Sequence, residues 1–243
     1  MLSGETEAAW EPADPFPGPQ ERSEFDIYAS MEPAKQVGGD FYDFFLIDDD
    51  HLAMLIADVS DKGVPAALFM MSSKILIADR ALMGGTPAQI MEFVNKRLCE
   101  NNEAAMFVTV WLGILEISTG KLTAVNAGHE DPMLNTNGRY VMFHEKHGMA
   151  AGAFNKAKYR DYEFTLKKGD SIFVYTDGVA EANDPQEHLF GTDRILTALN
   201  NEPDASPEQT LKNVRASVDE FVKDAKQFDD LTMLCIRYYG TEG

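Results

Sequence analysis

The stretch Val37-Gly38-Gly39-Asp40-Phe41-Tyr42-Asp43 decides the fold, together with Ile56-Ala57-Asp58-Val59-Ser60-Asp61-Lys62-Gly63 shortly after it. Two apolar runs, residues 41–47 and 51–57, connect these motifs and are separated by the acidic turn Asp48-Asp49-Asp50. Two apolar runs joined by a short polar turn are typical of a β-hairpin. The sequence therefore predicts two antiparallel strands, with one motif at the outer end of each.

Two aspartates stand at these strand ends. Because the ends of antiparallel strands lie side by side, we expect Asp40 and Asp58 to converge at one edge of a sheet. Gly38-Gly39 lets the backbone approach Asp40 closely, since glycine has no Cβ. Close carboxylates repel one another unless they share a proton or a cation, and oxygen ligands suit a hard ion such as Mg²⁺ or Mn²⁺. For the hairpin alone two interpretations stay open: a metal site, or two ordinary turn residues.

Composition limits the class of protein and its partners. The chain has 243 residues, 44% of them hydrophobic, which is enough for one large domain or two small ones. Lys and Arg number 21 against 40 Asp and Glu, giving a net charge of −19, so nucleic acid and anionic membranes are poor partners. Cys99 and Cys235 show no pairing pattern, which fits a cytoplasmic location. No signal peptide is visible, and charged residues interrupt the apolar stretch 64–83, so we expect no membrane insertion.

The order of the predicted elements indicates an α+β fold. Residues 1–24 are rich in Pro, Glu and Gly and are predicted to be a tail or linker, in part a cloning remnant, before a single domain over 25–243. Besides the hairpin we expect strands over 25–31, 107–117, 122–126, 140–143, 159–166, 171–175 and 231–239, and helices over 64–83, 87–99, 194–199 and 206–222. Many antiparallel strands with separate helix pairs predict helices packed outside a sheet sandwich.

Further aspartates stand at other strand ends. Asp177 follows the apolar run 171–175, and the pair Asp229-Asp230 precedes the last strand. Each alone is weak evidence, because aspartate favours turns. Together with Asp40 and Asp58, they predict one edge that holds one or two divalent ions and water. A water held by two metals attacks phosphorus in line without a side-chain nucleophile, and the sequence contains no P-loop, G-x-S-x-G or H-E-x-x-H motif.

These motifs resemble a known family. Over roughly residues 25–239 the chain is similar, in the same motif order, to the bacterial SpoIIE/RsbU branch of the PPM (protein phosphatase 2C-like) serine/threonine phosphatases. The residues that carry the resemblance are Val37–Asp43, Ala57–Gly63, Asn126-Ala127-Gly128-His129, Tyr175-Thr176-Asp177-Gly178-Val179 with Glu181, and Phe228-Asp229-Asp230-Leu231-Thr232.

The resemblance implies a fold and a metal centre. The fold is an α-β-β-α sandwich of two packed antiparallel sheets flanked by helix pairs, and the centre holds two ions, Mn²⁺ or Mg²⁺. Carried over by motif, Asp58 bridges both metals and the Val59 carbonyl binds one of them. Asp40, Asp177 and Asp229 complete the metal site and, with Asp58, are the expected catalytic residues. Whether Asp229 or Asp230 is the ligand stays open.

The resemblance also implies a substrate and partners. The expected substrate is phosphoserine or phosphothreonine on a STAS-domain anti-sigma-factor antagonist, in partner-switching control of bacterial transcription or sporulation. An upstream sensor or activator is expected, as is a homodimer formed through the helical layer. The helix over 64–83 belongs to the helix pair that is proposed to switch activity in this family.

Some positions depart from the motif pattern of the superfamily. Asp58-Val59-Ser60-Asp61 replaces Asp-Gly-His-Gly, so the histidine proposed as general acid has no counterpart, and the early phosphate-binding arginine is missing. Lys62 is interpreted as a solvated surface lysine rather than as an electrostatic replacement for that arginine, and His129 is interpreted as a hydrogen-bonded loop histidine.

Two other functions do not fit the sequence. An aspartyl nucleophile at Asp177 would need a second Asp where Tyr175 stands, and a receiver domain would need alternating βα units. A non-catalytic or autoinhibited regulatory binding module remains the alternative.

Overall fold

The computed structural model describes residues 22–34, 38–100 and 102–241. Ten strands form two five-stranded sheets, and every strand pair within them is antiparallel. In their spatial order, the strands of the first sheet are β1 (Phe25–Glu32), β10 (Leu231–Tyr238), β9 (Ser171–Tyr175), β6 (Met133–Asn135) and β7 (Tyr140–Met142). Those of the second are β2 (Phe41–Leu46), β3 (His51–Val59), β4 (Val108–Glu116), β5 (Lys121–Ala127) and β8 (Tyr162–Thr165).

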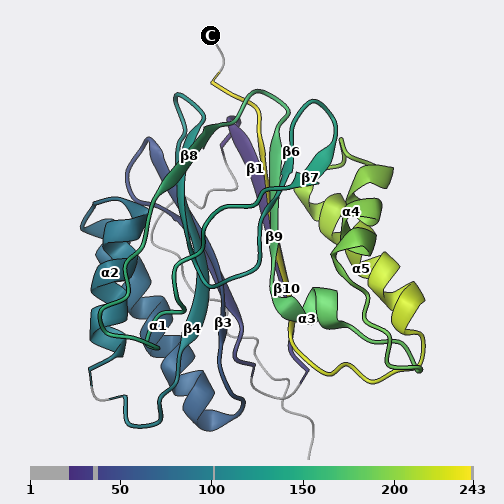
Figure 1. Cartoon of the computed structure of the whole chain (residues 1–243). Coiled ribbons are helices and arrows are strands. Elements are labelled where there is room, and N and C mark those ends of the chain that lie inside the picture. The colour runs from purple at the N-terminus through teal and green to yellow at the C-terminus, as the bar shows by residue number, and fades with distance from the viewer. Residues whose placement is uncertain (1–21, 35–37, 101, 242–243) are drawn as a thin grey trace, which may run out of the picture.

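The sheets pack face to face, with one helix pair outside each (Figure 1). The helices α1 (Val64–Leu82) and α2 (Pro87–Leu98) cover the second sheet, while α4 (Thr192–Asn201) and α5 (Pro207–Val222) cover the first. A short helix, α3 (Asp177–Glu181), directly follows β9. The predicted α-β-β-α sandwich is therefore confirmed.

Burial on both faces explains why β3 is apolar throughout. Leu52, Met54 and Ile56 point into the core between the two sheets, and the alternate residues Leu55 and Ala57 point into the core beneath α1 and α2. Successive side chains of a strand point to opposite faces of its sheet, so a central strand with both faces covered needs apolar residues at nearly every position. Each such side chain contributes about 1.5–3 kcal/mol when fully buried.

Local capping interactions fix where the helices begin. Thr86 and Gln89 form a reciprocal capping box at the start of α2, in which each side chain accepts a hydrogen bond from the backbone of the other. Ser206 caps α5 by accepting a hydrogen bond from the Gln209 backbone N–H. Pro65 lies in the first turn of α1, where its missing N–H is not needed.

The sequence did not predict two short elements of the structure, and it predicted one strand that is longer than the observed one. Strand β6 has only three residues and α3 only five, which is too short to show a hydrophobic period. The strand expected over 159–166 begins only at Tyr162. Just before it, the Asp161 carboxylate accepts a hydrogen bond from the Ala88 N–H at the start of α2, which connects this segment to the helical layer.

Among the described residues, no helix is long and apolar enough to cross a membrane. The predicted tail over residues 1–24 falls outside the described residues up to residue 21, as does Val37 of the first motif.

Candidate active site

One end of the sandwich gathers the predicted aspartates from both sheets. In the second sheet Phe41 pairs with Ala57, so Asp40 and Asp58 face each other one residue further out. In the first sheet β9 and β10 are neighbours, which brings Asp177 after β9 close to Asp229 before β10. The charges of Asp40, Asp177 and Asp229 all act on Asp58. The structure therefore brings together the four aspartates that the sequence predicts.

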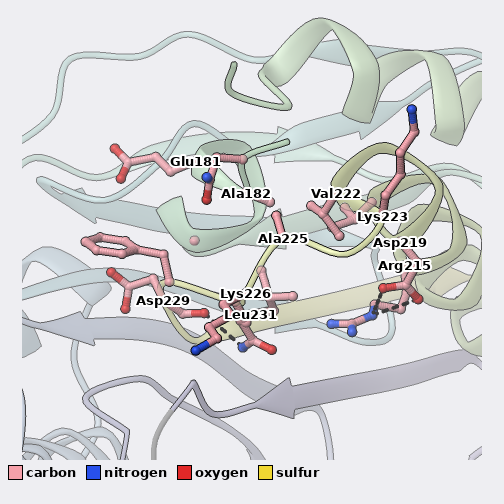
Figure 2. Close-up of a pocket in the computed structure, with 15 residues that line it drawn as sticks. Glu181, Ala182, Arg215, Asp219, Val222, Lys223, Ala225, Lys226, Asp229 and Leu231 are labelled. Carbon is pink, nitrogen blue, oxygen red and sulfur yellow. Dashed lines mark hydrogen bonds and ion pairs between the residues drawn. The ribbon is translucent and has the colours of Figure 1, made fainter. Parts of the chain in front are cut away.

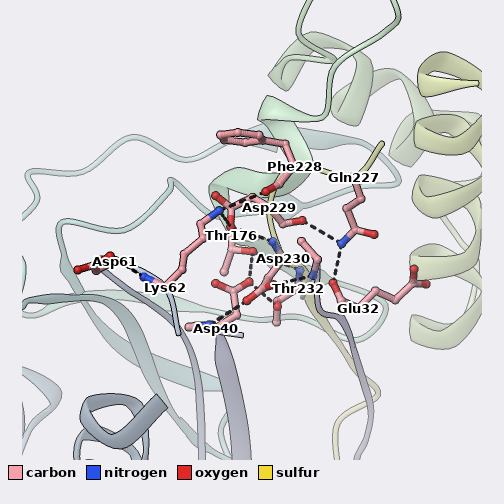
Figure 3. A network of polar contacts seen from close by, with 12 residues as sticks. Glu32, Asp40, Asp61, Lys62, Thr176, Gln227, Phe228, Asp229, Asp230 and Thr232 are labelled. Atoms are coloured by element: carbon pink, nitrogen blue, oxygen red, sulfur yellow. Dashed lines mark hydrogen bonds and ion pairs between the residues drawn. The ribbon is translucent and has the colours of Figure 1, made fainter. Parts of the chain in front are cut away.

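Asp40 connects the two sheets. It is buried, and its Oδ2 atom accepts hydrogen bonds from the hydroxyls of Thr176 at 2.7 Å and Thr232 at 2.5 Å. Thr176 follows β9 and Thr232 lies in β10, both strands of the first sheet, whereas Asp40 precedes β2 of the second sheet (Figure 3). Two donors on one carboxylate oxygen fix the orientation of Asp40 and leave its other oxygen for the centre of the site.

Burial and neighbouring charges raise the pKa values of these carboxyl groups. Burial raises the pKa of Asp58, and the charges of Asp40 and Asp177 add to the effect. Burial also raises the pKa of Asp40, and the charge of Asp230 adds to it, while hydrogen bonds from Thr232 and Thr176 act in the opposite direction. Burial, then the charges of Glu181 and Asp229, raise the pKa of Asp177. Negative charge is thus concentrated where no protein cation balances all of it, which favours protons or bound cations.

Asp229 and Asp230 have different environments. Asp230 is buried, and its oxygens accept hydrogen bonds from the backbone N–H groups of Ala34 at 2.8 Å and Gly39 at 2.9 Å. A Cβ at Gly38 would lie 2.2 Å from the Asp230 Oδ2 atom, so only glycine fits there. Asp229, by contrast, is half-buried, its Oδ1 atom accepts from the Asp230 N–H at 2.9 Å and lies 2.8 Å from Lys62 Nζ, and its charge acts on Asp58 and Asp177. Asp230 therefore holds the loop before β2, whereas Asp229 is the less constrained of the two carboxylates.

The Val59 carbonyl lies beside this loop. A Cβ at Gly39 would lie 3.0 Å from the Val59 oxygen and 3.7 Å from Asp58 Oδ1, and the Val59 N–H donates to the Gly39 carbonyl at 3.3 Å. The absence of a side chain at Gly39 keeps this narrow space open next to a backbone and a carboxylate oxygen. The space is consistent with the predicted role of Val59.

Lys62 lies at the edge of the site. Its Nζ atom is 2.8 Å from Asp229 Oδ1 and 3.2 Å from the Phe228 carbonyl oxygen, and 4.9 Å from the centre of the Phe228 ring (Figure 3). The Lys62 side chain is partly exposed, but these contacts keep its ammonium group beside Asp229. The interpretation of Lys62 as a solvated surface lysine therefore missed its ion pair, because no sequence pattern relates residue 62 to residue 229.

His129 is a buried, hydrogen-bonded loop residue, as expected. Its Nδ1 atom lies 2.9 Å from the hydroxyl of Thr109, which in turn donates to the Asp58 carbonyl at 3.4 Å. Burial lowers the pKa of His129 to about 3, so the ring is neutral. Asn126 fixes the loop by accepting from the His129 N–H and donating to its carbonyl. His129 therefore supports the strand end that carries Asp58.

Sequence reasoning missed the hydroxyl groups of Thr109, Thr176 and Thr232. Thr176 and Thr232 are each close in sequence to a predicted aspartate, and this proximity was the available signal. Thr109 gave no signal, because it reaches the site only through the pairing of β4 with β3.

The donor set fits a hard divalent cation. Carboxylate and carbonyl oxygens are the ligands that Mg²⁺ and Mn²⁺ prefer, and the raised pKa values of Asp40 and Asp58 show that positive charge is favoured beside them. In residues 22–34, 38–100 and 102–241, no three acidic, histidine or cysteine side chains form a ready-made coordination group. Asp229 is paired with Lys62 and Asp40 with two threonines, so ion binding would require small rearrangements of these side chains.

Comparisons of the sequence agree with this architecture. A family model described as Stage II sporulation protein E (SpoIIE) matches residues 48–239. Protein IcfG of Synechocystis sp. is 32% identical over 241 residues, which cover 88% of this chain and 38% of that protein. Phosphoserine phosphatase RsbU of Bacillus subtilis is 30% identical over 220 residues, covering 90% of this chain and 64% of that protein. The chain thus spans less than two thirds of the length of these curated relatives.

Solved structures share the fold. The PP2C domain of SiaA from Pseudomonas aeruginosa superposes with a TM-score of 0.76 at 23% identity, covering 87% of this chain and 84% of that one. RsbX, solved in complex with magnesium, gives a TM-score of 0.67 at 18% identity, covering 90% and 97%. The two sheets between helix pairs therefore have the fold of a PP2C domain. By the match of its sequence, the chain belongs to the SpoIIE family, the branch of the PPM phosphatases that its motifs resemble.

Proposed function

We propose that this chain is a metal-dependent protein serine/threonine phosphatase domain. The observation that carries the proposal is the convergence of Asp40, Asp58, Asp177 and Asp229 from both sheets, with raised pKa values at the first three. Several carboxylates that raise one another's pKa values in this way are typical of functional sites. The name of the relative RsbU, a phosphoserine phosphatase, supports the same activity.

Two divalent ions, Mn²⁺ or Mg²⁺, are part of the proposal. Asp58 would lie between them, with Asp40, Asp177, Asp229 and the Val59 carbonyl as the other protein ligands. Bound ions of this kind supply a nucleophile from water at neutral pH and neutralise charge on phosphoryl oxygens. The magnesium bound by RsbX supports this choice of ion class.

The protein's own residues would orient and attract the substrate. Thr176 and Thr232 hold Asp40 in one orientation, and Asp230 holds the Gly39 loop against the site. Lys62 places a positive charge at the mouth, where it attracts a phosphate group by simple electrostatics. These contacts preorganise the site before the substrate arrives, which is where most catalytic stabilisation originates.

The proposed substrate is a phosphoserine or phosphothreonine of a STAS-domain anti-sigma-factor antagonist, in bacterial cytoplasmic partner-switching regulation. The names of RsbU and of RsbP, both phosphoserine phosphatases of Bacillus subtilis, support phosphoserine as the substrate class. An upstream sensor or activator belongs to the same proposal, because the matched relatives are longer than this chain.

The test is hydrolysis of para-nitrophenyl phosphate and of a phosphoserine STAS-domain protein, with Mn²⁺, with Mg²⁺ and with a chelator. Asp177→Asn is compared with wild type and with Asp193→Asn, a control on the exposed surface of α4. We expect activity that requires metal and that is lost only in Asp177→Asn, with both variants folded by circular dichroism. Metal binding without hydrolysis of either substrate would favour the regulatory binding module. Absence of metal binding would overturn the proposal.

A further inference from the structure

A cavity of about 200 Å³ opens directly beside the candidate active site. It lies between α3, the end of α5 and the loop 223–230, and Asp229 of the site is also one of its lining residues (Figure 2). This loop continues into β10, so the segment that positions Asp229 also forms the cavity wall. The cavity and the aspartates therefore share one rim.

Part of the cavity wall is apolar. Val218 and Leu231 are buried members of the core beneath α4 and α5, and Ala182 and Val222 pack against the same core. Protein interiors leave few voids larger than a water molecule, and an apolar cavity of ~150 Å³ is known to bind benzene. The space therefore suits one bulky apolar group, such as a leucine or phenylalanine side chain.

The rim is held in place by polar contacts. Arg215 forms ion pairs with Glu32 at 2.7 Å and with Asp219 at 3.0 Å. The Gln227 side chain donates to the carbonyls of Glu32 at 2.8 Å and of Asp229 at 2.9 Å, tying the loop to β1. A rim fixed before binding reduces the entropic cost of ordering an incoming partner.

The rim carries charges of both signs. Glu181, Asp219 and Asp229 line the cavity together with the exposed residues Lys223 and Lys226, and Lys62 pairs with Asp229. A phosphoserine carries about −1.5 to −2 charges at neutral pH, so the lysines are the rim groups that would attract a phosphorylated segment.

We propose that this cavity is a specificity pocket for the protein substrate. It would take one bulky apolar side chain that lies within a few residues of the phosphoserine, while the phosphate occupies the aspartate site. The inference rests on the proposed phosphatase function and adds to it a sequence requirement of the substrate.

Synthetic phosphoserine peptides test the pocket. In an alanine background, a single leucine is moved through each position from four residues before the phosphoserine to four after it, and kcat/KM is measured for each peptide. Burial of one leucine contributes about 1.5–3 kcal/mol, so we expect at least a roughly tenfold higher kcat/KM at one or two positions. Equal values at all positions would overturn the proposal.

Filling the pocket provides the matched comparison. Ala225→Trp and, as a milder change, Ala182→Met are expected to reduce the ratio of kcat/KM between the best leucine peptide and the all-alanine peptide to about one. Ala216→Trp lies on the exposed face of α5, away from the cavity, and should keep the ratio of wild type. Because a ratio within one protein is compared, a general loss of activity does not imitate the result. A ratio retained in both filled variants would contradict the pocket.

Hydrolysis of para-nitrophenyl phosphate separates the two proposals. If wild type hydrolyses it but shows no positional preference among the peptides, the pocket is wrong and the phosphatase stands. If wild type hydrolyses neither, the phosphatase proposal fails, and the pocket is then judged by fluorescence polarisation of the same labelled peptides. Tighter binding of the best leucine peptide to wild type than to Ala225→Trp supports the pocket, and equal binding overturns it.

Discussion

The Nζ atom of Lys62 lies 2.8 Å from Oδ1 of Asp229, so a lysine just beyond β3 of one sheet forms an ion pair with an aspartate just before β10 of the other. The same ammonium lies over the ring of Phe228. The pair places the lysine cation beside Asp229, where the proposed function requires a metal ion. Lys62 and a divalent ion should therefore compete for Asp229.

Lys62→Met is predicted to tighten metal binding. Partly exposed ion pairs contribute about 0.2–1 kcal/mol, so its removal should lower the Kd for Mn²⁺ by roughly two- to fivefold. Isothermal titration calorimetry measures this directly. Lys158→Met, which breaks the exposed pair with Glu92, is the control and should leave the Kd unchanged. Weaker binding by Lys62→Met would mean that the lysine supports the site and does not compete with the metal.

Asp229→Asn and Asp230→Asn should fail in different ways. Asp229→Asn is expected to fold normally and to weaken Mn²⁺ binding by more than the ~10–100-fold that loss of an outer-shell partner costs. Asp230→Asn puts an amide donor against the backbone N–H of Ala34 or Gly39, so it should lower the free energy of unfolding by about 1–3 kcal/mol. Calorimetric binding and urea denaturation distinguish the two effects. The reverse pattern would identify Asp230 as the ligand.

The metal-free protein should become less stable as the pH rises from 7 to 8. Burial and the facing charges of Asp40, Asp177 and Asp229 raise the pKa of Asp58 to about 9, and burial raises that of Asp40 to about 7. The unfolded chain has lost these protons above about pH 5, whereas the folded chain retains them. The folded state therefore binds more protons, and its stability falls as they are removed, by at most ~1.4 kcal/mol per pH unit for each group.

Urea denaturation in the presence of a chelator measures this slope. Asp58→Asn should flatten it, because the group with the highest of these pKa values is gone. Saturating Mn²⁺ should also remove the decline, since metal binds the charged carboxylates and releases their protons. Stability that is constant or rises between pH 7 and 8 in the metal-free wild type would show that Asp40 and Asp58 do not retain protons in the folded state.

The outer face of α1 predicts an association surface. Val64, Leu68, Met71 and Ile75 are all more than half exposed and recur at intervals of four and three residues, the spacing of a coiled-coil seam. Ile75→Glu should convert the expected homodimer to a monomer in analytical ultracentrifugation without lowering the melting temperature, because the side chain is outside the core. Ala216→Glu on α5 is the control. A monomeric wild type, or a dimer that survives Ile75→Glu, would contradict this surface.

Much of the fold could be predicted because many of its strands are long and because its turns and helix starts contain characteristic residues. The hairpin around the Asp48-Asp49-Asp50 turn and the capped start of α2 at Thr86 are local features, which one window of sequence contains. Strand β6 was missed because its three residues lie between a loop and the turn signal Asn135-Thr136-Asn137-Gly138, and helix α3 because five residues carry no helical period.

The candidate site was predictable only in part, for a similar reason. Asp40, Asp58, Asp177 and Asp229 each stand at a recognisable strand end, and the order of the motifs indicated that they meet. The choice between Asp229 and Asp230 depends on contacts with Ala34 and Gly39, almost two hundred residues away in the chain. The Lys62 ion pair and the Thr109 contacts also join separate parts of the chain and leave no trace in local sequence.

The central claim is that strand-end aspartates from both sheets form one metal centre that hydrolyses phosphoserine. The most direct test is a Mn²⁺ titration in which metal binding and phosphate release from a phosphoserine protein are measured on the same sample. We predict that both saturate together with two ions per chain, and that Asp58→Asn, which removes the carboxylate between them, abolishes both while the protein stays folded. Phosphate release that persists in folded Asp58→Asn, or that is independent of Mn²⁺ and Mg²⁺ in wild type, would contradict the claim.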